Sequence, residues 1–143
     1  MGKPLIQWTI DAAVNSSFID TVVVSTDSVQ IADVAKQGGA RVPFIRPAEL
    51  SEDGSASIDV VLHAINELSS MGEHYSYVML LQPTSPLRTE KHIDESVQLL
   101  LSKGAKAVVS VCRNTHLVEW SGEIRGDLSM DEFVKNSESA KGS

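Results

Sequence analysis

Cysteine is nearly absent from this sequence, since Cys112 is the single one among 143 residues. One thiol excludes an internal disulfide and is typical of a reducing compartment, so we expect a cytoplasmic protein. The sequence also lacks an apolar run of the roughly 18 residues that a membrane-spanning helix needs. Its first residues lack the basic and apolar regions of a signal peptide. We therefore expect no membrane association.

Basic residues are also few. Lys and Arg number 12 against 19 Asp and Glu, which gives a net charge of −7. A nucleic-acid binder would carry a basic stripe along one face, and the sequence has no such stripe, so nucleic acid is excluded as a partner. A phosphate-bearing substrate would need a few cations concentrated locally, or a metal ion that supplies positive charge.

The residues that are present predict one globular domain with alternating helices and strands. Helical spacing of apolar residues predicts helices over residues 4–16, from about 27 to 38, around 58–68, and over 90–102. Short apolar runs predict strands at residues 21–25, 42–45, 78–81 and 107–111. Strands separated by helices of this length form parallel pairs with right-handed crossovers. The expected fold is a Rossmann-like α/β fold, with a mainly parallel sheet flanked by helices.

Two helices carry more detailed expectations. Asp27 is predicted to be the N-cap of its helix, with Gln30 at the capping-box position. On the third helix, His63 is expected to face solvent, opposite an apolar stripe that faces the core. That stripe consists of Ile58, Val61, Leu62, Ile65 and Leu68.

Polar segments follow the predicted strands, at the edge of the sheet where open α/β folds bind ligands. They are residues 25–27, 46–57 and 82–88. The last contains two prolines, which fix φ and would hold Gln82, Thr84 and Ser85 in a set geometry. The residues alone leave two alternatives. The segment is either a ligand-binding loop or a rigid connection whose hydroxyls only satisfy backbone groups.

Three segments resemble one enzyme family. Residues 80–88 read Leu-Leu-Gln-Pro-Thr-Ser-Pro-Leu-Arg, which resembles the signature of the acylneuraminate cytidylyltransferases, also called CMP-sialic acid synthetases. Val-Ser-Thr-Asp at residues 24–27 resembles the end of that family's second strand, and Arg-Pro-Ala-Glu-Leu at 46–50 resembles its RPxxL motif. The resemblance extends from Gly2 to about Arg113. It implies that residues 1–113 are a partial nucleotidyltransferase α/β domain, incomplete in this chain.

The resemblance also implies a reaction and its participants. CTP and a nine-carbon, sialic-type sugar acid would give a CMP-sugar and pyrophosphate, with Mg²⁺ neutralising the phosphates and the protein forming a homodimer. Nucleotide contacts would fall on Arg46, Ser55 and Ser57, and a sugar-acid contact on Gln82. Thr84, Ser85 and Arg88 would support the loop that carries Gln82.

Two of these residues have structural alternatives. Ser55 is nearly as well explained as the N-cap of the third helix. Arg88 is alternatively a surface partner of Glu90 or Asp94, an interaction that contributes little to stability.

Parts of the family pattern have no counterpart in this sequence. The family's basic, glycine-rich phosphate loop precedes the point at which Met1 begins to match, and its magnesium-binding aspartates and catalytic arginine are missing. We therefore expect no metal ligand here, leave the catalytic residues unassigned, and expect the 143 residues alone to be inactive. Met1 is interpreted as an internal methionine and Ser143 as a cut site. Without the family's first strand, the sheet would expose apolar edges.

Residues 114–143 are interpreted as the start of a dimerisation arm followed by a mobile tail, because their apolar residues follow neither a helical nor a strand period. Two hypotheses of different class remain. The chain is a segment of a cytidylyltransferase, or it is a non-catalytic nucleotide- or sugar-acid-binding domain, or inactive fragment, that associates through an exposed edge. The mass of the natural polypeptide distinguishes them. N-acetylneuraminic, legionaminic and pseudaminic acids are alternative sugar substrates.

Overall fold

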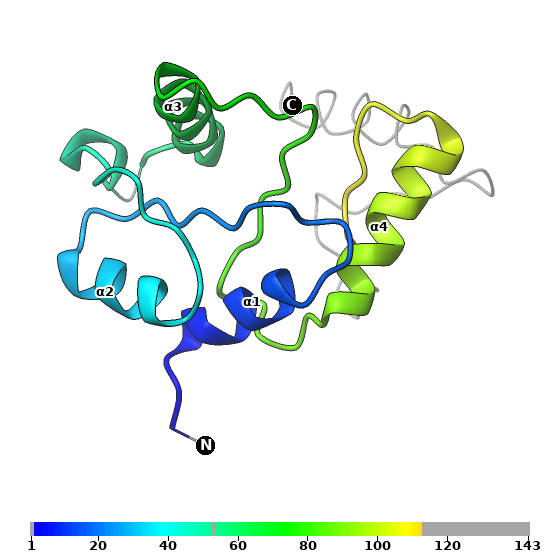
Figure 1. Cartoon of the computed structure of the whole chain (residues 1–143), viewed down its shortest axis with the longest axis horizontal. Helices are drawn as coiled ribbons and strands as arrows, with labels where there is room; N and C mark the ends of the chain where they lie inside the picture. The colour runs from blue at the N-terminus through cyan, green and yellow to red at the C-terminus, as the bar shows by residue number, and fades with distance from the viewer. Residues whose placement is uncertain (1, 53, 113–143) are drawn as a thin grey trace, which may run out of the picture. The chain divides into compact units, whose positions relative to one another are not determined.

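The computed structural model describes residues 2–52 and 54–112, which are coloured in Figure 1. The chain divides into two compact units, Met1–Val108 and Val109–Ser143, and all of the described helices lie in the first. The predicted dimerisation arm and tail, residues 114–143, lie outside the described residues. The predicted domain boundary at residue 113 therefore stays a prediction.

The described residues form four α-helices and one short 3-10 helix. They are α1 (Leu5–Val14), α2 (Val29–Gln37), η1 (Ala48–Leu50), α3 (Ser57–Ser70) and α4 (Glu90–Lys103). The four predicted helices are therefore confirmed. At the start of α4, His92 Nδ1 accepts a hydrogen bond from the Thr89 amide, and Gly104 with φ 58° ends the helix in the left-handed conformation. In residues 2–52 and 54–112, no helix is long and apolar enough to cross a membrane.

Helix α1 is the centre of the packing, because it contacts α2 on one side and α4 on the other (Figure 1). Toward α2, Ile10 packs with Ala35 and Ala40, and toward α4, Ala12 and Ala13 pack with Ile93. The small alanine side chains let the helices approach closely. Apolar residues of the extended segments complete the two clusters: Val22, Val24 and Val42 in the first, and Ile19, Val22, Met79 and Leu81 in the second.

The first predicted strand, residues 21–25, pairs in parallel at one position with Arg41, the residue directly before the second predicted strand. Val23 and Arg41 form a parallel bridge, in which the Arg41 amide donates to the Val22 carbonyl and the Val24 amide to the Arg41 carbonyl. No longer strand forms anywhere in the described residues. The predicted mainly parallel sheet is therefore not confirmed by the described residues, which form only this one bridge.

Pro43 explains why the pairing stops. In a regular parallel ladder the next donor after Arg41 is the amide of residue 43, followed by the amide of residue 45. Proline has no amide hydrogen, so the ladder cannot continue to the Val24 carbonyl. The carbonyl of Thr26 instead receives the amide of Arg46, at 2.9 Å. The second segment therefore contains one residue more than a regular ladder would.

The other two predicted strands are extended but unpaired among the described residues. No backbone hydrogen bond joins residues 78–81 or 107–111 to another described segment, and Val78 and Leu80 are exposed. Strand hydrogen bonds come from a neighbouring segment, so an apolar run without a neighbour stays irregular however well it suits a strand. The strand predictions at these two places are not confirmed by the described residues.

One local expectation is wrong and another holds only in part. The N-cap of α2 is Ser28, whose hydroxyl accepts from the Ile31 amide, and Asp27 is not a cap. In the predicted stripe of α3, Leu68 is buried and Val61 half-buried, but Ile58, Leu62 and Ile65 are exposed. The His63 ring does not face solvent, because it packs edge-on against Phe44 with ring centroids 5.1 Å apart. Most of the stripe has no apolar layer of the described residues to cover it, and the helix turns its His63 side toward Phe44.

Candidate functional site

Arg46 begins the polar loop after the second extended segment, and its backbone fixes where that loop starts. The hydrogen bond from its amide to the Thr26 carbonyl places it beside the carboxyl end of the first segment. This is the position at which open α/β folds bind ligands. The structure therefore brings Arg46 next to Asp27, although 18 residues lie between them in the sequence.

The Arg46 guanidinium has two partners. Its Nε donates to the Ser51 hydroxyl at 2.9 Å, and its Nη2 lies 3.7 Å from Asp27 Oδ1. Ser51 in turn donates to the Pro47 carbonyl at 3.2 Å, so its hydroxyl is oriented with a lone pair toward Arg46. The Arg46 side chain is 22% exposed. Among the described residues its remaining guanidinium hydrogens have no acceptor, which leaves one edge of a rigid donor available.

Ser55 and Ser57 lie before and at the start of α3, but neither is its N-cap. The N-cap position is Ala56, which provides no side-chain acceptor. The Ser55 hydroxyl donates to the Glu49 carbonyl at 3.1 Å, closing the loop over η1. Ser57 is the first residue of α3 and is exposed. The alternative role of Ser55 as a helix cap is thus wrong.

The loop at residues 82–88 is built from two successive turns. The Ser85 amide donates to the Gln82 carbonyl and the Arg88 amide to the Ser85 carbonyl, each at 3.3 Å. The Arg88 guanidinium also donates to the Gln82 carbonyl, at 3.4 and 3.5 Å. These contacts hold the backbone of Gln82, while the side chains of Gln82, Thr84 and Ser85 stay exposed.

Arg88 does not pair with either acid that the sequence offers as an alternative. Asp94 accepts from the Ser16 hydroxyl at 2.5 Å and from the Ser17 amide at 3.1 Å, which ties α4 to the end of α1. No ion pair joins Arg88 to Glu90 among the described residues. The geometry of Arg88 agrees with a role in holding its loop.

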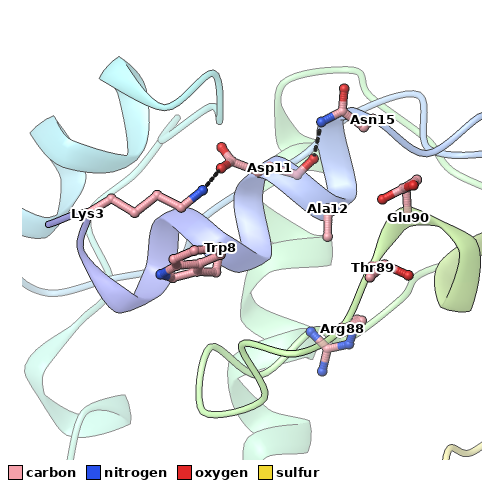
Figure 2. Close-up of a pocket in the computed structure, with 8 residues that line it drawn as sticks. All are labelled: Lys3, Trp8, Asp11, Ala12, Asn15, Arg88, Thr89 and Glu90. Atoms are coloured by element: carbon pink, nitrogen blue, oxygen red, sulfur yellow. Dashed lines mark hydrogen bonds and ion pairs between the residues drawn. The ribbon is translucent and has the colours of Figure 1, made fainter. Parts of the chain in front are cut away.

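A groove lies between α1 and the start of α4, and Figure 2 shows its lining. Lys3 lies over the Trp8 ring, 3.9 Å from its centroid, and pairs with Asp11. The hydrogen bond from Lys3 lowers the pKa of Asp11 below its usual range. Since the charge of Lys3 is compensated by Asp11, and Glu90 faces the same groove, this is a poor site for a triphosphate. Of the predicted site residues only Arg88 lines it.

The described residues contain no group of three or more His, Cys, Asp or Glu side chains that could hold a metal ion. Mg²⁺ prefers several oxygen ligands in octahedral geometry. Asp27, the acid nearest to Arg46, already faces that cation. The residues present therefore do not fit a protein-bound magnesium site.

Sequence reasoning missed two residues of this site, Asp27 and Ser51. The residues around Asp27 predict a helix cap, and this local pattern does not indicate a contact with Arg46. Ser51 follows the Arg-Pro-Ala-Glu-Leu motif directly, and a hydroxyl five residues after an arginine is not by itself a signal. The Asp27 contact depends on the backbone hydrogen bond that brings Arg46 to the Thr26 carbonyl, and the Ser51 contact depends on a loop that returns on itself through η1.

Comparison with known proteins gives a consistent result. Residues 1–122 match the family model described as cytidylyltransferase. The chain is 42% identical over 139 residues to a CMP-N,N'-diacetyllegionaminic acid synthase of Legionella pneumophila, covering 96% of this chain and 60% of that protein. It is 37% identical over 106 residues to a pseudaminic acid cytidylyltransferase of Campylobacter jejuni, covering 74% and 46%.

An N-acylneuraminate cytidylyltransferase of Escherichia coli is also similar, at 40% identity over 143 residues, covering 94% of this chain and 33% of that protein. The chain therefore spans three fifths or less of the length of each of these three relatives.

Proposed function

Because this chain belongs to the cytidylyltransferase family, we propose that the protein containing it transfers CMP from CTP to a nonulosonic, sialic-type sugar acid and releases pyrophosphate. The observation that carries the proposal is the similarity, at 37–42% identity, to three proteins whose names specify such sugar acids. Those names specify three different acids. We therefore propose the class of substrate and not one member of it.

In the proposed reaction, a hydroxyl oxygen of the sugar acid forms a bond to the α-phosphorus of CTP. The bond from that phosphorus to the oxygen bridging to the β-phosphate breaks, pyrophosphate leaves, and the hydroxyl loses its proton. Positioning of the two substrates and stabilisation of charge carry most of the catalysis of such a step. The described residues would contribute to positioning, since none of them is assigned to the chemical step.

Arg46 is proposed to contact the nucleotide through the guanidinium edge that has no partner in the described residues. Ser57, the first residue of α3, is proposed to contribute its exposed hydroxyl as a second nucleotide contact. Ser55 is more restricted, because its hydroxyl proton is used by the Glu49 carbonyl. It is left as an acceptor, so it would bind a donor such as the cytosine amino group or a ribose hydroxyl, and not a phosphate oxygen.

Gln82 is proposed to contact the sugar acid. Its side chain is exposed, while its carbonyl is held by the Ser85 amide and the Arg88 guanidinium. An amide side chain on a fixed backbone offers one acceptor and two donors, which suits a polyhydroxylated acid. Thr84, Ser85 and Arg88 would keep this loop in shape.

Magnesium dependence is proposed from the chemistry of the substrates. A triphosphate carries negative charge that Mg²⁺ neutralises, and the described residues have few cations to replace it. Since these residues do not fit a metal site, no step is assigned to them through the metal. Loss of activity in the presence of a chelator, restored by excess Mg²⁺, is the expected result.

We further propose that the extended segments belong to one mainly parallel sheet in the complete protein, and that this protein is a cytoplasmic homodimer. Support for the sheet comes from the parallel bridge at Val23 and the apolar runs at 78–81 and 107–111. Support for the dimer comes from the apolar residues of the segment 114–143, which lies outside the described residues.

Sedimentation of the complete protein should show a dimer. The double variant Trp120→Asp, Phe133→Asp should sediment as a monomer, and a dimer indifferent to both charges would contradict the role of this segment.

The test of the proposed function uses the product of the complete reading frame. Pyrophosphate release should require both CTP and one of the three sugar acids, and ATP, GTP or UTP should not replace CTP. The 143-residue segment alone should release none. Binding of CTP or of an acid without turnover would favour the non-catalytic binding domain instead.

A further inference from the structure

Three features determine where the guanidinium of Arg46 lies. The first is the extra residue in the second extended segment. Because Pro43 interrupts the ladder, Arg46 occupies the register position that a regular ladder gives to residue 45, opposite the Thr26 carbonyl. The arginine thereby reaches the end of the first segment, where Asp27 follows Thr26 directly.

The other two features are Asp27 and Ser51, which contact different parts of the guanidinium. Ser51 accepts from Nε at 2.9 Å and is itself fixed by donating to the Pro47 carbonyl. Asp27 Oδ1 lies 3.7 Å from Nη2. Two contacts on different nitrogens of a planar group restrict its rotation as well as its position. No described residue uses the remaining edge.

Asp27 has no other partner among the described residues. It does not cap α2, since Ser28 does, and its side chain is 50% exposed. An exposed ion pair contributes little to stability, so stability alone gives no reason for an acid at this place. A negative charge next to a site for a triphosphate is also unfavourable by simple attraction and repulsion. The reason for an acid at position 27 must then lie in its effect on Arg46, the cation that it faces.

We propose that Asp27 and Ser51 are positioning residues for Arg46, which hold its guanidinium so that the free edge meets the nucleotide. The proposal rests on the proposed function, because it assumes that Arg46 binds CTP. Neither residue touches the substrate in this account. Both act by removing the rotational freedom that Arg46 would otherwise lose on binding, and such preorganisation increases affinity.

The proposal can be tested because its sign is opposite to that of simple electrostatics. Asp27→Asn removes a negative charge near the nucleotide and should strengthen CTP binding if charge were all that mattered. If Asp27 positions Arg46, the same change should weaken CTP binding, by about three- to tenfold in Kd. Ser51→Ala leaves the charge unchanged and should also weaken it, by about three- to tenfold.

The experiment measures Kd for CTP by calorimetry on the complete protein, together with the KM for the sugar acid and the melting temperature. Matched controls are Asp33→Asn on the exposed face of α2 and Ser102→Ala near the end of α4, where the Ser102 hydroxyl donates to the Leu99 carbonyl. The Asp27 and Ser51 variants should raise Kd for CTP while leaving the sugar-acid KM and the melting temperature at the control values. A purely structural role would lower the melting temperature instead.

A double-mutant cycle separates action through Arg46 from any other effect. In the Arg46→Ala background, Asp27→Asn should no longer weaken CTP binding. If Asp27→Asn strengthens binding or leaves it unchanged in the unmodified background, or weakens it equally in both backgrounds, the proposal is overturned. If the unmodified protein does not bind CTP at all, the proposed function itself fails, and this result is distinct from the others.

Discussion

Arg46 and Gln82 follow different extended segments, and their local contacts differ in kind. The guanidinium of Arg46 is held by side chains, whereas the backbone of Gln82 is held and its side chain is exposed. Each therefore presents one polar group from a fixed base. If the two residues serve different substrates, single substitutions should separate the two binding steps.

Arg46→Ala should weaken CTP binding and leave the sugar-acid KM nearly unchanged. The substitution removes a charge-assisted contact of about 1.5–3 kcal/mol, which corresponds to roughly 10- to 150-fold in Kd for CTP. Calorimetry with CTP measures it directly. Lys36→Ala, which removes one exposed positive charge near the end of α2, is the matched control. An unchanged Kd for CTP would exclude Arg46 from the nucleotide site.

Gln82→Ala should raise the sugar-acid KM or lower kcat, with the KM for CTP unchanged. The loop should keep its shape, because the contacts of Gln82 within it come from its carbonyl. Steady-state kinetics with each substrate varied in turn provides the measurement. Gln98→Ala on the exposed side of α4 is the control. If Gln82→Ala raised only the KM for CTP, its assignment to the sugar acid would be wrong.

At this scale the sequence predicted which residues lie at the segment ends better than what each one contacts. The motif at 46–50 placed Arg46 in a polar loop, which the structure shows. The motif could not show that Asp27 faces this arginine. The local sequence around Asp27 suits a helix cap, and it carries no information about a partner far away in the sequence. The Ser28 hydroxyl caps α2 by accepting from the Ile31 amide, so the Asp27 carboxylate is not needed as a cap and can contact Arg46.

Among the elements, α4 is attached to α1 by an apolar contact and a polar one. The apolar contact is Ile93 against Ala12 and Ala13. The polar contact is the Asp94 carboxylate, which accepts from the Ser16 hydroxyl and from the Ser17 amide at the end of α1. Ser16 is buried. If the Asp94 carboxylate were removed, the Ser16 hydroxyl would therefore lose its acceptor where water replaces it poorly.

Asp94→Ala should therefore lower the free energy of unfolding by about 1–3 kcal/mol. Glu95→Ala, one residue further along α4 on its exposed side, should change it by less than about 0.5 kcal/mol. Urea denaturation followed by circular dichroism compares the two variants. Equal effects of both substitutions would mean that Asp94 does not hold α4 to α1.

A second polar contact joins the amino ends of the extended segments. The guanidinium of Arg41 donates to both Glu73 oxygens, at 2.6 and 2.7 Å, and the Tyr75 hydroxyl donates to Glu73 and contacts Thr21. These hydrogen bonds, with that from Arg41 first, lower the pKa of Glu73 from 4.5 to about 2, and Glu73 in turn raises the pKa of Arg41. The cluster lies at the opposite end of the segments from Arg46 and Gln82, so we expect it to affect folding and not binding.

The lowered pKa of Glu73 predicts a pH dependence of stability. A carboxyl group with a lower pKa in the folded state than in the unfolded state stabilises the fold fully above the unfolded pKa. Its contribution should thus be complete above about pH 4.5 and disappear as the pH falls toward about 2. The effect will be small because the pair is on the surface and screened by solvent. Glu73→Gln should flatten the loss of stability across this window, and an unchanged slope would contradict the assignment.

Helices and strands differed in how well the sequence predicted them. The helices are encoded by apolar spacing within each segment, and all four formed. A strand depends on a partner far away in the sequence, and among the described residues only the predicted strand at 21–25 has one, at Arg41, directly before the predicted strand at 42–45. Even there the proline at position 43, which lies within the predicted strand, ends the ladder. The predicted apolar stripe of α3 is only partly buried for a related reason, since a stripe faces the core only where another element covers it.

At the scale of the whole molecule two observations stand together. The described residues expose many apolar side chains, and the chain aligns with only part of each relative. Exposed apolar residues include Ile58 and Leu62 of α3 and Val78 and Leu80 of the third segment. The chain spans 60% of the Legionella pneumophila relative and 46% of the Campylobacter jejuni one. The activity proposed here is therefore a property to be measured on the complete protein.

In the most direct measurement, the complete protein is incubated with CTP, Mg²⁺ and all three sugar acids together. The products are identified by mass spectrometry, and the released pyrophosphate is quantified. The account predicts at least one CMP-sugar, formed in a one-to-one ratio with pyrophosphate and absent when CTP is replaced by UTP. Unchanged CTP, or pyrophosphate released without any CMP-sugar, would contradict it.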